Sequence, residues 1–354
     1  MTVYIVNLIL IIVWGFFLTH TNPTDQKKKT YCFIVAVQWI LISGLRGLTV
    51  GNDTSQYFVV FQNGLNTPWN TLISNYWNYL FKGQDANDPG YFLLQKIFQG
   101  FTQDYQLWLF FIAIIFTGLM ARWVYKYSSM PDVSFVIYSV LFFAFYSLTG
   151  HRQTLATALI FFLGYEYAKK RQFVKFAIVA FIAFTLHKSS LVFIIYYFIA
   201  NISITPLYAA IMIVAATVIV LFGKELYGPV ALAFGFDESQ IEYDGGGAET
   251  YATILLLVCV VTFIFAPWIN KQRRDAKYIF NLVFLTITST LLVYQNQSFM
   301  RIQQYYSMII MIAIPEIIQA VDKKYRGYAY MAVVIFLFAY LLRQDLKYSF
   351  FFAT

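Results

Sequence analysis

Long apolar runs recur along the whole chain, and they constrain its fold more than any other feature. A membrane-spanning helix needs about 20 mostly apolar residues, and we place about twelve such runs between Thr2 and Leu342. Some are short enough to be re-entrant or interfacial. Because 60% of the residues are apolar and only 12% are charged, no soluble class fits. The sequence predicts an all-α, polytopic transmembrane protein that forms a single membrane domain over residues 1–354.

The first apolar run is expected to be a retained span and not a signal peptide, because it lacks a basic segment before it and a small-residue cleavage site after it. Two cysteines, Cys32 and Cys259, both fall inside predicted spans, which argues against a disulfide framework. The sequence contains no phosphate-binding P-loop, no dinucleotide-binding glycine pattern and no paired CxxC motif. It therefore predicts neither a nucleotide-driven pump nor a structural zinc site.

Two long segments are expected outside the bilayer. Residues 47–105 carry many aromatic residues in a polar background, which is typical of short amphipathic helices lying at a membrane surface. Thr67 before Pro68 is a candidate start of one such helix. Residues 223–250 are acidic and rich in glycine, and we expect them to form an extracytoplasmic loop. A mobile lid is one role compatible with this composition, and the sequence assigns the loop no role.

The distribution of charge predicts the topology. If the loop that carries Lys27, Lys28 and Lys29 is cytoplasmic, alternating spans place most of the 25 Lys and Arg residues in the cytoplasm. Most of the 17 acidic residues then lie on the other face, together with both termini. This pattern accounts for the net charge of +8 without a nucleic-acid partner.

One stretch, SGLRGLTVGNDTSQY from Ser43 to Tyr57, stands out as a candidate site. Arg46 follows an apolar run, Gly51 permits backbone conformations that other residues avoid, and Asp53 lies one helical turn before Tyr57. An arginine and a carboxylate at this position are suited to bind an anionic group and to accept a proton. Alternatively, the arginine is an interfacial anchor and Asp53 is a helix N-cap.

The predicted topology brings several more ionisable residues to the same outer face. Three arginines lie next to apolar runs there, and their planar guanidinium groups suit a diphosphate. Ionisable groups at membrane depth are costly and often mark a substrate path. No histidine spacing typical of a metal site occurs, so no metal is expected. The converging residues are Arg46, Asp53, Asp88, Arg152, His187 and Arg301.

Each of these residues also has a purely structural interpretation. Asp88 before Pro89 is a good helix N-cap, and His187 at the end of an apolar run is a common helix-end residue. Gln153 and Tyr305, which follow Arg152 and Arg301, are candidates for hydrogen bonds to sugar hydroxyls or for helix caps.

At these residues the chain resembles the EpsG family of bacterial exopolysaccharide polymerases, which are relatives of the Wzy polymerases of O-antigen and capsule. Two departures from the family pattern are Asp88, where the family often has Glu, and Lys188, where it usually has a small or apolar residue. The matching residues are Arg46 with Gly51, Asp53 and Tyr57; Asp88 with Pro89, Gly90 and Tyr91; Arg152 with Gln153; His187 with Ser189; and Arg301 with Tyr305.

The resemblance implies a GT-C-like glycosyltransferase in the bacterial cytoplasmic membrane, with an active site that faces outward. Its substrates would be undecaprenyl-diphosphate-linked oligosaccharide repeat units, joined without a metal or other cofactor. A chain-length regulator and a flippase of the same pathway are expected partners. Asp53, or as second choice Asp88, is expected to be the base, with the arginines stabilising the departing diphosphate. His187 and the tyrosines, Tyr57, Tyr91 and Tyr305, would orient sugars.

Other functions are compatible with the same composition. A flippase for the same lipid-linked sugar would place charges along a path through the bilayer, whereas the candidate residues gather at one face. An O-antigen ligase would use the same lipid donor and the same arginines. A membrane acyltransferase or a purely structural scaffold fits less well, because the candidate histidine is predicted to lie outside and unused charge at membrane depth is costly.

Overall fold

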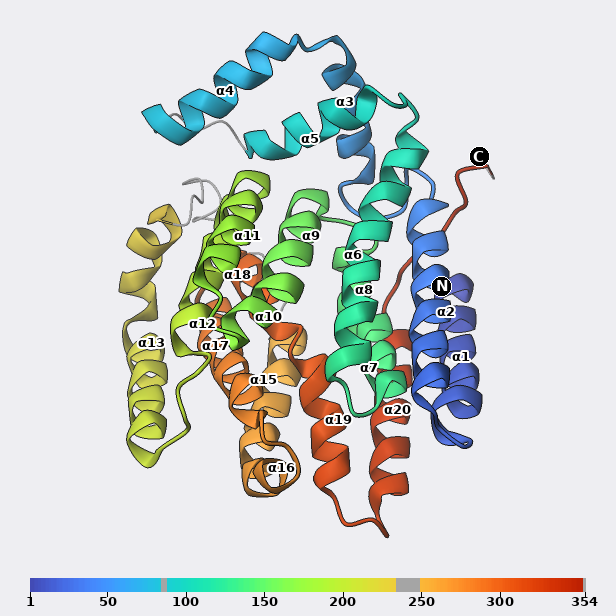
Figure 1. Cartoon of the computed structure of the whole chain (residues 1–354), viewed down its shortest axis with the longest axis vertical. Helices are drawn as coiled ribbons and strands as arrows, with labels where there is room; N and C mark the ends of the chain where they lie inside the picture. Colours follow the sequence, from blue (N-terminus) through green and yellow to red (C-terminus); the bar gives the residue numbers. More distant parts are fainter. Residues whose placement is uncertain (84–87, 234–248, 353–354) are drawn as a thin grey trace.

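The computed structural model describes residues 1–83, 88–233 and 249–352, and these residues form helices and connecting segments without a strand. Most helices lie side by side along the longest axis of the molecule (Figure 1). A smaller group, α3 to α5, lies across one end of this bundle. The fold therefore has a helical body and a cap of three helices above it.

The first half of the body is built around two buried elements, α6 and α7. Every residue of α7 is buried, and α6 packs along α2. Helix α2 begins at Thr24, whose side chain accepts a hydrogen bond from the backbone N–H of Lys27, and α6 begins in the same way at Asp104. The elements are α1 (Thr2–Gly15), η1 (Phe16–His20), α2 (Asp25–Gly44), α6 (Tyr105–Tyr127), α7 (Pro131–Ile137), η2 (Tyr138–Phe142) and α8 (Phe143–Tyr146).

The second half of the body carries the remaining helices. Several apolar runs of the sequence appear here as short helices joined by π-helical or 3-10 segments, and α17 packs against α13, α15 and α18. The elements are α9 (His151–Thr157), η3 (Ala158–Leu163), α10 (Gly164–Lys169), α11 (Phe173–Leu186), η4 (Lys188–Phe193), α12 (Ile194–Ile199), α13 (Pro206–Ala233), α15 (Glu249–Ile264), α16 (Ala266–Gln272), α17 (Ala276–Gln295), η5 (Gln297–Phe299), α18 (Met300–Ser307), α19 (Ile310–Ala320) and α20 (Arg326–Leu342).

The cap occupies most of the segment 47–105, where the sequence predicts short amphipathic helices. Its three helices are α3 (Thr54–Asn66), α4 (Trp69–Lys82) and α5 (Pro89–Gln99). Helix α4 starts directly after Pro68, as expected from the sequence, and it leaves Trp69, Ile73 and Trp77 exposed. These aromatic and apolar side chains suit a surface at the membrane interface.

The structure supports a helical membrane protein but not the predicted count of about twelve spans. By length and composition, four helices among the described residues could cross a membrane, or five if the bent pair α15 and α16 is one span. The others fall short because they are 10 to 17 residues long or, like α2, carry several charges. Apolar runs counted along the sequence therefore overstate the number of continuous long helices.

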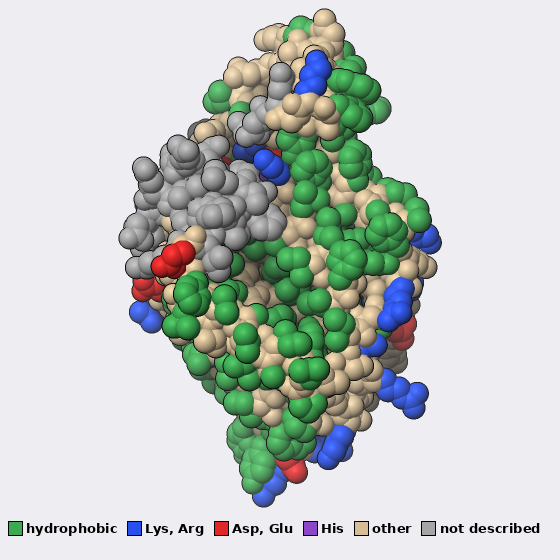
Figure 2. Space-filling view, turned by 90° about the vertical axis from the view of Figure 1, so that its left-hand side faces the viewer, with side chains coloured by type: hydrophobic (Ala, Val, Ile, Leu, Met, Phe, Trp, Pro, Cys, Tyr) green, Lys and Arg blue, Asp and Glu red, His purple; other side chains and the backbone are tan. Residues whose placement is uncertain are grey.

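The outer surface of the body suits a bilayer. Residues Pro206–Gly223 of α13 have a mean hydropathy of 2.3, yet only 11% of this segment is buried inside the protein. Figure 2 shows a flank of the molecule on which hydrophobic side chains predominate, with Lys and Arg mainly at its lower end and edges. Exposed apolar surface of this extent is costly in water, so lipid is its natural solvent.

The segment 223–250 differs in part from the expected loop. Helix α13 does not end at Phe222 but continues to Ala233. Residues 234–248, which include the acidic and glycine-rich part of the predicted loop, lie outside the described residues.

The end of the body opposite the cap is held by ion pairs. Arg273 bonds to Glu316 at 2.6 Å and to Asp275 at 2.7 Å, and Lys126 bonds to Glu166 at 2.7 Å. Most basic loops of the sequence lie at this end. The cap and the basic loops thus occupy opposite ends of the helices, which is the separation that the charge pattern predicts.

Candidate active site

The centre of the candidate site is Asp88, at the start of α5. Its carboxylate Oδ2 accepts hydrogen bonds from Arg152 Nη1 at 3.1 Å and lies 2.8 Å from His187 Nδ1. Its other oxygen, Oδ1, accepts a bond from the backbone N–H of Lys188 at 3.0 Å. Three segments that are far apart in the sequence, at the starts of α5 and α9 and the end of α11, therefore meet at one buried carboxylate.

Pro89 and Gly90 let α5 approach α11 closely enough for this contact. Gly90 lies against Thr185 on the last turn of α11, and a Cβ at Gly90 would stand 2.4 Å from Thr185 Oγ1. Pro89 occupies the first turn of α5, where a missing N–H costs nothing. Asp88 itself has a φ of +62°, so its backbone turns sharply into the helix. The Asp-Pro-Gly string thus positions the carboxylate.

The surroundings keep Asp88 ionised. Burial alone raises the pKa of its carboxyl group, but the hydrogen bond from His187, the charge of Arg152 and the Lys188 N–H together hold the pKa below its ordinary value. A carboxylate with a lowered pKa is a weak base. Asp88 is therefore better suited to orient and polarise its partners than to remove a proton itself.

Aromatic rings build the wall next to Arg152. The ring of Tyr57 stacks on that of His151, with centroids 4.1 Å apart. The guanidinium of Arg152 lies 6.0 Å from the Tyr57 ring, and its Nε donates to the Tyr57 hydroxyl at 3.5 Å. Tyr91 is fully buried beside Tyr57 and accepts a hydrogen bond from Trp108 Nε1 at 3.3 Å. Tyr57 thus fixes the position of Arg152, and Tyr91 packs against Tyr57 from the next helix but one of the cap.

Arg46 lies behind this wall and not on its surface. Only 3% of it is exposed, and its guanidinium donates to the carbonyl of Ser43 at 2.6 Å and to His151 Nε2 at 2.8 Å. Burial lowers the pKa of Arg46 to about 10, which leaves it charged at neutral pH. Because His151 carries the stacked Tyr57, Arg46 supports the site from within. A direct role in holding substrate, as the sequence suggested, would require this network to open.

Asp53 lies apart from the cluster of Asp88, Arg152 and His187. It is the N-cap residue of α3, without a side-chain capping bond, and its carboxylate makes no hydrogen bond or ion pair with any other described residue. Tyr57, one turn later, is the nearer contributor to the site. The structure therefore does not join the two carboxylates that the sequence proposed as alternative bases.

Gln153, Arg301 and Tyr305 link the cluster to α18. Gln153 Nε2 donates to the backbone carbonyl of Arg301 at 2.6 Å, and the hydroxyl of Ser189 donates to that of Tyr305 at 3.4 Å. Tyr305 is fully buried, whereas Arg301 is exposed. Gln153 and Tyr305 therefore hold neighbouring segments together through hydrogen bonds. Of Gln153, Arg301 and Tyr305, only Arg301 is exposed on the surface.

An apolar groove adjoins the cluster. It has a volume of about 330 Å³ and is lined by residues of α4, α5, α6, α11 and the helix that begins at His151. Gly90 and Leu186, direct neighbours of the Asp88 cluster in sequence, form part of its wall, together with Leu94, Ile115 and Leu159. The groove is therefore apolar, and Asp88 and His187 follow or precede its lining residues in the sequence without lining it themselves. Among the described residues no group of three potential metal ligands occurs.

His151 is the residue of this site that sequence analysis missed. It is fully buried between Arg46 and Tyr57, and it joins the corner at the end of α2 to the start of α9. Its position directly before Arg152, after a glycine with a φ of +53°, was the available signal. In the sequence alone, a histidine next to a candidate arginine is weak evidence for a site residue, because its stacking on Tyr57 is visible only in the structure.

Gly51 gives a direct test of the packing at this corner. A Cβ there would lie 1.9 Å from the carbonyl oxygen of Leu148, and Gly51 has a φ of +85°. We expect Gly51→Ala to lower the free energy of unfolding by more than about 2 kcal/mol, since strain and a backbone clash add. Gly83→Ala is the matched control, because Gly83 has a φ of +63° but no described atom within 4 Å of its Cβ position. Thermal unfolding of the purified variants in detergent measures the difference, and equal losses would contradict the close approach.

The comparisons with known proteins give one match. A protein-family model described as the EpsG family matches residues 29–353, which is nearly the whole chain. Neither the curated proteins nor the solved structures include a significant match. The matched region contains every residue of the candidate site.

Proposed function

Because the chain belongs to the EpsG family, a Wzy-like polymerase family, we propose that it polymerises an exopolysaccharide from undecaprenyl-diphosphate-linked oligosaccharide repeat units. The observation that carries this proposal is the cluster of Asp88, Arg152 and His187 beside an apolar groove. An amphiphilic substrate with a diphosphate, a sugar chain and a long apolar tail needs both features in one place. The GT-C-like architecture remains a prediction.

We place this site at the outer face of the bacterial cytoplasmic membrane. The supporting argument is the charge pattern: basic loops gather at the end of the helices opposite the cap, and such loops favour the cytoplasm. A chain-length regulator and a flippase of the same pathway are the proposed partners, and no cofactor or nucleic acid enters the proposal.

In the proposed complex, Arg152 and the outward-facing Arg301 hold the diphosphate of the donor. Arg152 is part-exposed. One nitrogen of its guanidinium group donates a hydrogen bond to Asp88, and the group lies near the ring of Tyr57, so its orientation is fixed. A fixed cation stabilises the charge that grows on the departing diphosphate. The prenyl tail next to the diphosphate would lie in the apolar groove that Leu94, Ile115 and Leu159 line.

His187 is the proposed base. Its Nδ1 faces the ionised carboxylate of Asp88, which fixes the proton on Nδ1 and leaves Nε2 as the acceptor. Nε2 has no hydrogen-bond partner among the described residues. In the reaction, the acceptor hydroxyl gives its proton to Nε2 while its oxygen attacks the anomeric carbon of the donor. The bond from that carbon to the phosphate oxygen breaks, and undecaprenyl diphosphate leaves.

A substitution of Asp53, the base that the sequence favoured, distinguishes a mechanism with His187 as the base from one with Asp53 as the base. If His187 is the base, we expect Asp53→Asn to change the rate of polymer extension by less than about threefold, because Asp53 contacts none of the cluster. Chain lengthening by purified protein in liposomes measures this rate. A loss of extension in Asp53→Asn, with extension kept in a His187 variant, would instead identify Asp53 as the base.

The function itself is tested with the same liposomes and a defined undecaprenyl-diphosphate oligosaccharide, without nucleotide sugar. A polymerase gives a ladder of products that differ by one repeat unit. An O-antigen ligase gives a single transfer to a different acceptor. Movement of the lipid between leaflets without a ladder would support the flippase instead.

A further inference from the structure

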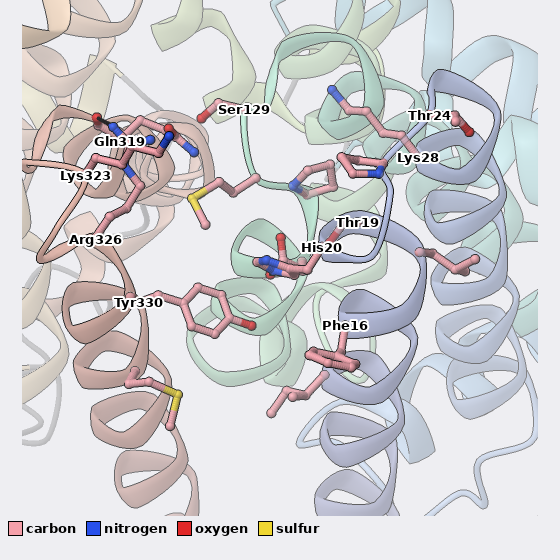
Figure 3. A pocket seen from close by; sticks show the side chains of 18 of the residues that line it. Phe16, Thr19, His20, Thr24, Lys28, Ser129, Gln319, Lys323, Arg326 and Tyr330 are labelled. Atoms are coloured by element: carbon pink, nitrogen blue, oxygen red, sulfur yellow. Dashed lines mark hydrogen bonds and ion pairs between the residues drawn. The ribbon is translucent and has the colours of Figure 1, made fainter.

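A second cavity, of about 1020 Å³, lies at the end of the helices opposite the candidate active site. It is bounded by η1 and the start of α2 on one side and by the end of α19 and α20 on the other (Figure 3). Figure 3 shows Phe16 and Lys28 across the cavity from Arg326, with His20 beside Tyr330 between them. The polymerase site proposed above uses none of these residues.

The polar part of this cavity has an excess of positive charge. Lys28 donates to the carbonyl of Ser128 at 2.8 Å, and one nitrogen of Arg326 donates to the carbonyl of Gln319 at 2.7 Å. These partners are neutral backbone carbonyls, so neither cation forms an ion pair with a described residue. Lys323 makes no hydrogen bond or ion pair with any other described residue. Three cations thus line one cavity without a carboxylate bonded to any of them.

The two acids of the cavity are already engaged. Asp132 is buried and lies 2.8 Å from His20 Nε2, and Asp25 accepts a hydrogen bond from the hydroxyl of Tyr125 at 2.7 Å. Neither carboxylate is bonded to the cations of the cavity. The polar part therefore attracts an anion.

The remaining wall is apolar and continues onto the outer surface. Ile12, Phe16 and Met331 line the cavity, and more than half of Phe16 and Met331 is exposed. Farther along α20, Ile335 and Phe336 are similarly exposed. A ligand in this cavity therefore meets positive charge at one end and an apolar surface, open to the bilayer, at the other.

We propose that this cavity binds an anionic phospholipid. The phosphate diester lies between Lys28, Lys323 and Arg326, and the acyl chains lie along Phe16 and Met331. A basic pocket between helices, at the end where the basic loops gather, is the arrangement that recognises acidic lipid headgroups. A free phosphate would use the cations but not the apolar wall, and the volume of the cavity exceeds what one phosphate fills.

Native mass spectrometry of the full chain in detergent tests this site independently of polymerase activity. The probes are dioleoylphosphatidylglycerol, dioleoylphosphatidylcholine and inorganic phosphate. We expect the anionic lipid to bind more tightly than the zwitterionic one and Lys323→Gln to weaken its binding about fivefold. Lys324→Gln is the matched control, because Lys324 does not line the cavity. Met331→Trp, which fills the apolar part, should also weaken binding of the anionic lipid.

Four results would overturn the proposal. Equal binding of the two lipids would show that the charge of the headgroup does not matter. Equal effects of Lys323→Gln and Lys324→Gln would show that the lipid does not bind in this cavity. Phosphate that displaces the anionic lipid completely would identify a site for a free anion. A dimer that Met331→Trp dissociates would mean that a second copy of the chain, and not lipid, covers this face.

Discussion

Replacing His187 with asparagine is expected to lower the rate of polymer extension by a factor of about 10² to 10⁴, the usual contribution of a general base. Asparagine keeps an N–H donor at the place of Nδ1, so the bond to Asp88 and the connection between α5 and α11 can persist. It has no group at the place of Nε2. The variant therefore removes the proposed base while it spares the buried carboxylate. The rate is measured as chain lengthening in liposomes.

His20→Gln is the matched control, since His20 bonds through Nε2 to a buried aspartate, Asp132, at the opposite end of the helices, and glutamine keeps an N–H donor at that place. It should retain the wild-type rate. His187→Asn should keep the thermal stability of the wild type to within about 1 kcal/mol in the free energy of unfolding. Retained extension in a folded His187→Asn protein would exclude His187 as the base.

Replacing Arg152 is expected to have the second large effect. Removing a fixed donor to a developing negative charge costs a factor of about 10² to 10³ in kcat, and we expect this loss for Arg152→Ala. The alanine variant also leaves Asp88 with one cation fewer, and breaking a buried ion pair costs about 3 to 5 kcal/mol of stability. Arg152→Lys separates the two effects, because it retains a charge for Asp88 but loses the planar fork.

We therefore expect Arg152→Lys to fold and to extend polymer at least about tenfold more slowly than the wild type. Arg122→Lys is the control, since Arg122 is exposed and forms an ion pair with Glu166 far from the site. The assay is the same chain lengthening, run at saturating donor so that kcat is measured. A wild-type kcat in Arg152→Lys would show that a positive charge at this position is enough for catalysis, and it would contradict a role for the planar guanidinium group.

Much of the fold follows from hydropathy. The alternation of apolar runs with basic and acidic loops predicts a helical membrane protein, and Pro68 predicts the start of α4. Hydropathy fails where continuity of a helix matters. The run from Val133 to Leu148 folds as α7, η2 and α8, because the backbone changes its hydrogen-bond pattern within an apolar sequence. Hydropathy does not distinguish such a segment from one regular helix.

The candidate site was predictable as a set of residues but not as a network. The order of the apolar runs places Arg46, Asp88, Arg152 and His187 at one end of the helices, and the structure has them there. Asp88 with Pro89 reads equally well as a simple helix cap. Its contacts with α9 and α11 depend on how closely α5 approaches, which Gly90 permits.

The sequence by itself determined that this chain is helical and apolar, and at which end of its helices the ionisable residues gather. Only the tertiary structure decided that Arg152 and His187 meet on Asp88, that Arg46 turns inward to His151, and that Asp53 stands apart. The physical reason is that hydropathy fixes the depth of a residue along a helix. The rotation of each helix about its axis, which decides what a side chain touches, is set by packing against neighbouring helices.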